Sequence, residues 1–139
     1  MSNLFKLFDV SGSALSAQSV RLNAVASNMA NAQVVSGSPE QAYRAKYPVF
    51  ASVLQGVGPN ATATPVQVVG VMESQAEARA EYAPNHPLAD EQGYVYKPNV
   101  NVVEEMANMI SASRSYQNNV EVMNTTKQLL LRTLQLGQQ

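Results

Sequence analysis

Apolar residues recur along the last third of the chain with the spacing of a long amphipathic helix. From Val102 to Leu134 they return at alternating steps of four and three residues, interrupted only at Ser113 and Lys127, which is the a/d pattern of a coiled-coil seam. Asn101 stands where a side chain can cap the first turn, and Gly137 stands where the pattern stops. The pattern therefore predicts one continuous helix over residues 101–137.

A second apolar set on the same helix lies away from this seam. Its members are Val103, Ile110, Val122, Leu129, Leu131 and Leu136. A helix that is apolar on more than one side needs more than one packing partner, and the chain offers one further long helix. We therefore expect other copies or other proteins to cover the remaining faces. The alternative is a helix whose solvent-exposed side is simply somewhat apolar.

The start of the chain carries the same periodicity. Apolar or small residues step by four and three from Leu4 to Ala32, except at Gln18, which predicts a second long helix. Asn23, Asn28 and Asn31 are unusual there, because Asn competes for backbone hydrogen bonds and is a mediocre helix former. Two interpretations stay open: Asn28 or Asn31 caps the helix end, or the asparagines form a polar ladder between subunits.

The middle of the chain has the short alternating runs of β-strands. Strands are predicted at residues 43–50, 66–72 and 93–97, with a loop over 56–65. Residues 75–82 could form a strand or one helical turn, and the alternation of charged residues with alanine favours a strand. Pro48 places the first strand at a sheet edge or a bulge, because proline cannot donate a ladder hydrogen bond.

The predicted fold is mainly α: long N- and C-terminal helices pair as an antiparallel coiled coil, with a small β-rich insert between them. Residues 1–35 and 99–139 form the paired helices, and residues 36–98 form the insert. The intrasubunit seam is predicted at Leu15, Leu22, Val25, Met29, Met109, Tyr116, Val120, Met123 and Leu130. Contacts with neighbouring subunits are predicted at Asn28, Val103, Ile110, Val122, Leu129 and Leu131.

Composition narrows the possible functions. Only 14% of the residues are charged and the net charge is −1, so no basic stretch could neutralise a row of nucleic-acid phosphates. There is no cysteine, and His86 is the only histidine, so we expect no metal or other cofactor. No catalytic constellation, membrane span or cleavable signal peptide is apparent, and we expect the protein not to be an enzyme.

Several stretches carry a more specific signal. Residues 13–32, SALSAQSVRLNAVASNMANA, resemble the N-terminal signature of bacterial flagellar rod and hook proteins. Residues 99–138, together with the segments 43–46 and 86–100, resemble the flagellar basal-body rod protein family, and most closely its proximal rod members. One small departure is Met29, where leucine is common.

This resemblance implies a structural subunit of a helical rod. In that family the terminal helices pair and stack around a central export channel, the insert faces outward, and the rod crosses the periplasm and transmits torque. The implied partners are further copies, other proximal and distal rod proteins, the rod-base adaptor, the type III export apparatus and the surrounding rings. Export without a cleaved signal peptide is implied as well. The competing class is a soluble coiled-coil adaptor or secretion chaperone.

Overall fold

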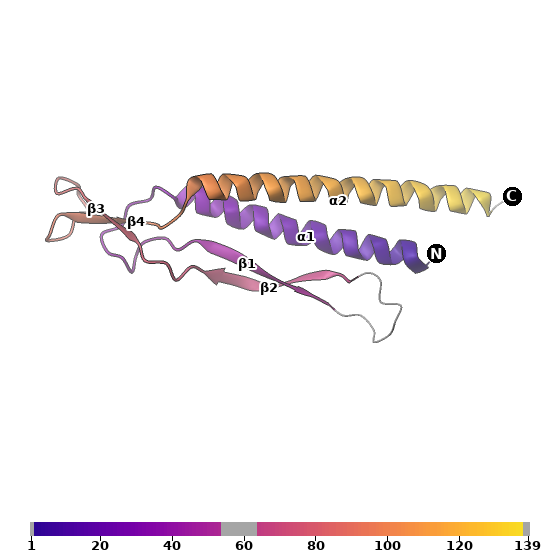
Figure 1. Ribbon diagram of the computed structural model, residues 1–139, viewed down its shortest axis with the longest axis horizontal. Helices are drawn as coiled ribbons and strands as arrows, with labels where there is room; N and C mark the ends of the chain where they lie inside the picture. The colour runs from indigo at the N-terminus through magenta and orange to yellow at the C-terminus, as the bar shows by residue number, and fades with distance from the viewer. Residues whose placement is uncertain (1, 54–63, 138–139) are drawn as a thin grey trace.

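Two helices run along the length of the molecule, and two β-hairpins occupy the chain between them (Figure 1). The computed structural model describes residues 2–53 and 64–137. Most of the loop predicted over 56–65 lies outside these residues. The elements in chain order are α1 (Ser2–Asn31), β1 (Lys46–Ser52), β2 (Val66–Glu73), β3 (Arg79–Tyr82), β4 (Tyr94–Lys97) and α2 (Val102–Leu136).

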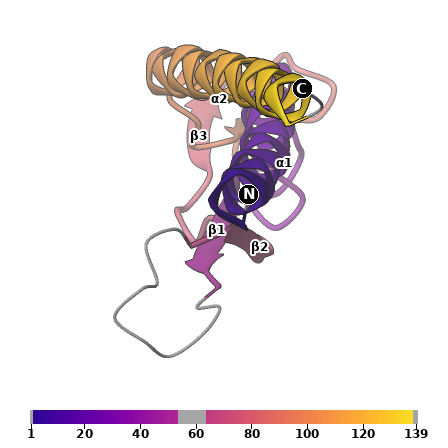
Figure 2. The same ribbon diagram turned by 90° about the vertical axis from the view of Figure 1, so that its right-hand side faces the viewer.

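The helices lie side by side and run in opposite directions, so that both chain ends lie at the same end of the molecule (Figures 1 and 2). Hydrogen bonds between the two helices join Arg21 to Asn108 and Asn28 to Glu105. The prediction of two long terminal helices with a small β insert is confirmed. The insert contains two separate two-stranded antiparallel sheets, one pairing β1 with β2 and the other pairing β3 with β4.

The ends of α2 follow the predicted signals. The Asn101 side-chain oxygen accepts hydrogen bonds from the backbone N–H groups of Val103 and Glu104, at 3.1 and 3.3 Å. Glu104 and Glu105 lie in the first turn, where the helix dipole favours negative charge. At the other end Gly137 donates its N–H to the carbonyl of Thr133 at 3.1 Å. Its φ of −81° is right-handed, so this position does not need the special freedom of glycine.

The β1–β2 hairpin runs along α1, on the side of α1 that faces away from most of α2 (Figures 1 and 2). The ladder is regular except for a shift between Val49 and Phe50, directly after Pro48, as the sequence predicted for a proline-bearing strand. Near the far end of the hairpin, the hydroxyl of Ser13 on α1 accepts a hydrogen bond from the Val66 N–H at 3.1 Å. The β1–β2 hairpin therefore lies lengthwise against α1.

The β3–β4 hairpin lies at the end of the molecule opposite the chain termini (Figure 1). Tyr82 and Tyr94 face each other across its strands, with ring centroids 5.3 Å apart in an edge-to-face arrangement. Asp90 organises its turn, because its carboxylate accepts hydrogen bonds from the backbone N–H groups of Gln92 and Tyr94. Gly93 has a φ of +83°, a left-handed conformation that favours glycine.

The core of a single copy is thin and made of small residues. Its central cluster contains Ala32, Ala45 and Val100, with Val102 packed against it. The largest fully buried side chains are only Val95, Asn28 and Pro98. Since small side chains bury little apolar area, most of the large apolar residues of α2 remain on the surface.

Candidate assembly surfaces

The side of α2 that faces α1 is lined at its centre by small and polar residues. Glu105, Ala112 and Thr126 are its buried positions, and Met109, Met123 and Leu130 are half-buried between them. Their spacing alternates between three and four residues or sums of these steps, as a helix seam requires. On α1 the buried residues are likewise small or polar: Ser11, Ala17, Ala24, Val25 and Asn28.

The predicted intrasubunit seam is only partly covered within one copy. Val25 is buried, and Leu15, Leu22, Met29, Met109, Met123 and Leu130 are half-buried, which leaves their assignment open to test. Tyr116 and Val120 are exposed, at 38% and 36%. For Val120 the reason is that the large apolar residues Met106 and Val120 each lie one residue after a stripe of small or polar side chains, Glu105, Ala112, half-buried Asn119 and Thr126, which lets the helices approach. Tyr116 lies seven residues from both Met109 and Met123, on the same side of α2, so its assignment to the seam stays a prediction.

Asn28 also differs from its prediction as a contact between subunits. Its side chain is fully buried within one copy, at a junction of α1, β1 and α2. The amide oxygen accepts hydrogen bonds from the Lys46 N–H at 2.8 Å and the Tyr43 hydroxyl at 2.9 Å. The amide nitrogen donates to the Lys46 carbonyl at 3.0 Å and to a carboxylate oxygen of Glu105 at 3.3 Å. All four hydrogen-bonding positions of the amide are therefore used inside the subunit.

This buried junction depends on the amide of Asn28. An aspartate there would lose both donors and would place a second carboxylate beside the buried Glu105. An alanine would leave the partners of the amide unsatisfied, at a cost of about 1–3 kcal/mol for each buried group. Nearby, burial raises the pKa of Tyr47, and the negative charges of Glu105 and Glu104 raise it further.

Two stripes of large apolar residues flank the buried side of α2 and remain exposed. One lies one residue after the buried and half-buried positions of that side and their continuation in the same repeat, and its apolar members are Val103, Met106, Ile110, Val120, Leu131 and Leu134. The other lies one residue before such positions and contains Val122, Leu129 and Leu136. Because each helical residue advances about 100°, the two flanks lie on nearly opposite sides of α2. One neighbouring helix cannot cover both flanks at once.

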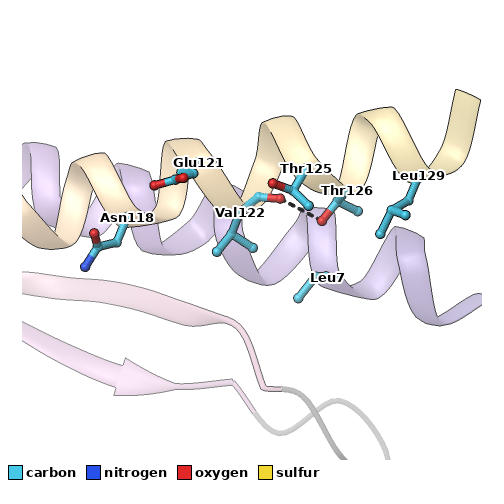
Figure 3. A pocket seen from close by; sticks show the side chains of 7 residues that line it. All are labelled: Leu7, Asn118, Glu121, Val122, Thr125, Thr126 and Leu129. Atoms are coloured by element: carbon cyan, nitrogen blue, oxygen red, sulfur yellow. Dashed lines mark hydrogen bonds between the residues drawn. The ribbon is translucent and has the colours of Figure 1, made fainter.

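A groove opens along the second flank, between α2 and the start of α1 (Figure 3). It has a volume of about 410 Å³, and Leu7 of α1 faces Val122 and Leu129 across it. Thr126 donates its hydroxyl hydrogen bond to the Val122 carbonyl at 2.7 Å, which leaves its methyl group for the apolar lining. The groove thus offers an apolar surface at the end of the molecule where both termini lie.

The described residues offer little chemistry beyond packing. Within residues 2–53 and 64–137, no three His, Asp or Glu side chains gather closely enough to hold a metal ion. In the same part of the chain, no helix is both long and apolar enough to span a membrane.

Comparison with known proteins shows the family to which the chain is similar. Residues 8–37 match the family described as flagella basal body rod protein, and residues 91–136 match the family described as flagellar basal body rod FlgEFG protein C-terminal. The chain is 55% identical to the flagellar basal-body rod protein FlgC of Escherichia coli O6:H1 over 135 residues, which cover 97% of this chain and 98% of the relative.

This chain belongs to the FlgC family of flagellar basal-body rod proteins. It is 54% identical to the FlgC of Yersinia enterocolitica over 136 residues, which cover 98% of this chain and 99% of that protein. The FlgC of Salmonella typhimurium is 53% identical over 97% of this chain and 98% of its own length. As a member of this family the chain is a structural protein of the basal-body rod and not an enzyme. The resemblance noted in residues 13–32 and 99–138 is thereby confirmed.

Proposed function

We propose that this chain is a subunit of the proximal rod that polymerises helically through the two exposed flanks of α2. The observation that supports this most is the pair of apolar flanks on nearly opposite sides of one helix. In a lone copy both would lie in water, whereas a helical lattice supplies a different neighbour to each side. Val103, Ile110, Val122, Leu129 and Leu131 are the proposed contacts with neighbouring subunits, and all five are exposed.

In this proposal the two helices act as an antiparallel coiled-coil pair and form the inner part of the rod. Residues 1–35 and 99–139 line the export channel, and residues 36–98 form the outer insert. The paired helices and the β1–β2 hairpin, which lies on the side of α1 that faces away from most of α2, support this division of the molecule (Figures 1 and 2). Interlocked helices packed on several sides would resist twisting and transmit torque to the distal parts of the flagellum.

The proposed partners are further copies of this chain, other proximal rod proteins, the distal rod protein and the rod-base adaptor. The type III export apparatus would deliver the subunit to the periplasm without a cleaved signal peptide. The outer insert could additionally meet the surrounding basal-body rings. These partners follow from the family and from the amount of apolar surface that one copy leaves uncovered.

A charge placed on either flank tests the proposal. We expect Ile110→Asp and Leu129→Asp to abolish swimming of a flagellated host that lacks its own copy, while the variant protein is still exported. Ile110 is 55% exposed and Leu129 is 49% exposed, so the fold of one copy should tolerate the change. The matched control is Gln128→Asp, an exposed polar position on the same helix that lies two residues from both Thr126 and Leu130 and so belongs to neither flank.

Normal motility of the Ile110 and Leu129 variants would refute the assignment of the flanks. The alternative function, a soluble coiled-coil adaptor or secretion chaperone, predicts one partner helix and therefore sensitivity on one flank only. A result in which one of the two aspartate variants swims normally would favour that alternative.

A further inference from the structure

The β1–β2 hairpin is held against α1 with little apolar burial of its own. In its two strands only Pro48, Val66 and Val68 are half-buried, and the other strand residues are exposed. A two-stranded hairpin is marginally stable by itself, and so little buried apolar area attaches it weakly. Pro48 and Phe50 lie beside Val25 of α1 around a shared cleft, so specific polar contacts must supply much of what fixes the hairpin in position.

Two such contacts fasten opposite ends of the hairpin to α1. At the Lys46 end, the Asn28 amide accepts from the Lys46 N–H and donates to the Lys46 carbonyl, as a neighbouring strand would. At the Val66 end, the Ser13 hydroxyl accepts from the Val66 N–H. Ser13 joins α1 to β2 only, whereas Asn28 also contacts Glu105 on α2.

We propose that Asn28 is the positioning residue that fixes the β1–β2 hairpin and both helices as one mechanical unit. Its amide completes the free edge of β1 at the residue where that strand begins, and the same amide bonds to the first turn of α2. Motion of either helix is therefore passed to the hairpin through hydrogen bonds rather than through a broad apolar interface. If the proposed function is right, torque in the rod passes between the inner helices and the insert. The hydrogen bonds of Asn28 then lie on the path of that force.

Spin-label distances in the purified full-length chain test this inference, because the chain has no cysteine of its own. The pair Ser19→Cys with Glu73→Cys reports the distance from α1 to the hairpin, and Ser19→Cys with Gln117→Cys reports the distance between helices. All three positions are exposed. We expect Asn28→Ala to broaden the first distance distribution about twofold or more and to leave the second unchanged. We also expect the Lys46 amide to exchange its hydrogen at least about tenfold faster, because it loses its acceptor.

The matched control is Asn23→Ala, an exposed asparagine on the same helix, which should leave both distributions unchanged. Should Asn28→Ala fail to fold, Tyr43→Phe removes one hydrogen bond from the same amide and should broaden the hairpin distribution by a smaller amount. An unchanged hairpin distribution in the folded variants overturns the proposal. Equal broadening of both distributions overturns it too, because Asn28 would then be an ordinary core residue. Neither measurement uses motility, so a failure of this proposal about Asn28 is distinguishable from a failure of the proposed rod function.

Discussion

Three hydrogen bonds converge on the carboxylate of Asp90, from the N–H groups of Gln92 and Tyr94 and from the hydroxyl of Tyr96. These bonds favour the ionised carboxylate, the Tyr94 N–H most strongly, and they lower the pKa of Asp90. The bond from its hydroxyl to Asp90 raises the pKa of Tyr96 in turn. Because the folded chain binds this proton less readily than the unfolded chain, the stabilisation is complete above the ordinary pKa of about 4 and is lost as the pH falls through the lower folded value.

Asp90→Asn should therefore have an effect that depends on pH. Asparagine keeps one acceptor oxygen but cannot supply two, so at pH 7 we expect a lower melting temperature than in the unchanged chain. The difference should shrink as the pH is lowered below about 4, because the unchanged chain then loses its own carboxylate. Thermal melts between pH 7 and pH 3 measure this, with the neighbouring exposed residue changed in Glu91→Gln as the control. A gap that stays constant over this range would show that the charge of Asp90 does not matter.

The contacts of Asn28 could not be predicted from the sequence. Its presence in a helix was recognisable as unusual, and the neighbouring Asn31 does bond to the Ser27 carbonyl in the last turn of α1. The partners of Asn28, however, lie 18 and 77 residues away, at Lys46 and Glu105. No local spacing encodes such contacts. An asparagine ladder between subunits was therefore a reasonable expectation for Asn28 and a wrong one.

At the scale of elements, periodicity located both helices and all four strands, because helix and strand repeats are written directly into the sequence. The observed strand boundaries differ from the predicted ones where the residues make tertiary contacts instead of pairing in a sheet. The strand predicted from residue 43 begins at Lys46, since the Tyr43 hydroxyl bonds to Asn28 and Ala45 belongs to the small core cluster. The strand predicted over 75–82 is reduced to Arg79–Tyr82.

The rotation of α2 about its axis was harder to predict than its extent. The heptad pattern combined positions from two faces: Met109 and Met123 belong to the side that meets α1, whereas Met106 and Val120 belong to an exposed flank. A protein built for assembly can place small residues in its own interface and larger ones toward its neighbours. The apolar pattern of α2 then combines residues that meet α1 with residues that face neighbouring subunits, and it does not distinguish the two sets.

Ala112→Leu tests which face of α2 meets α1. Ala112 has no exposed surface, so a larger side chain should overpack the interface and lower the free energy of unfolding by about 1–3 kcal/mol. The control is Ala107→Leu, an exposed alanine in the same helix, which should change it by less than about 0.5 kcal/mol. Chemical denaturation of both variants measures the difference. Equal stability of the two variants would contradict the buried stripe described here.

At the scale of the whole molecule, sparse charge and exposed apolar residues point in the same direction. A protein with 14% charged residues has few groups to keep its surface solvated, and this one exposes large apolar residues on α2 and on the β1–β2 hairpin. The thin core of alanine and valine is consistent with a subunit that gains much of its order from neighbours. Membership of a rod protein family explains why one copy leaves so much apolar surface uncovered, because neighbouring subunits of a rod would cover it.

The end of α2 is where this dependence on neighbours should be measurable. Every residue from Leu131 to Gly137 is exposed, and the helix extends past the start of α1 (Figure 1). Helical segments without packing partners are marginal in water, so amides over residues 131–136 should exchange at least about tenfold faster than those around Ala112 in the isolated chain. In assembled rods the same amides should become protected, since the proposed contact at Leu131 lies among them. Strong protection of this end in an isolated monomer would mean that the helix needs no neighbour, and it would favour a self-sufficient coiled-coil adaptor over a rod subunit.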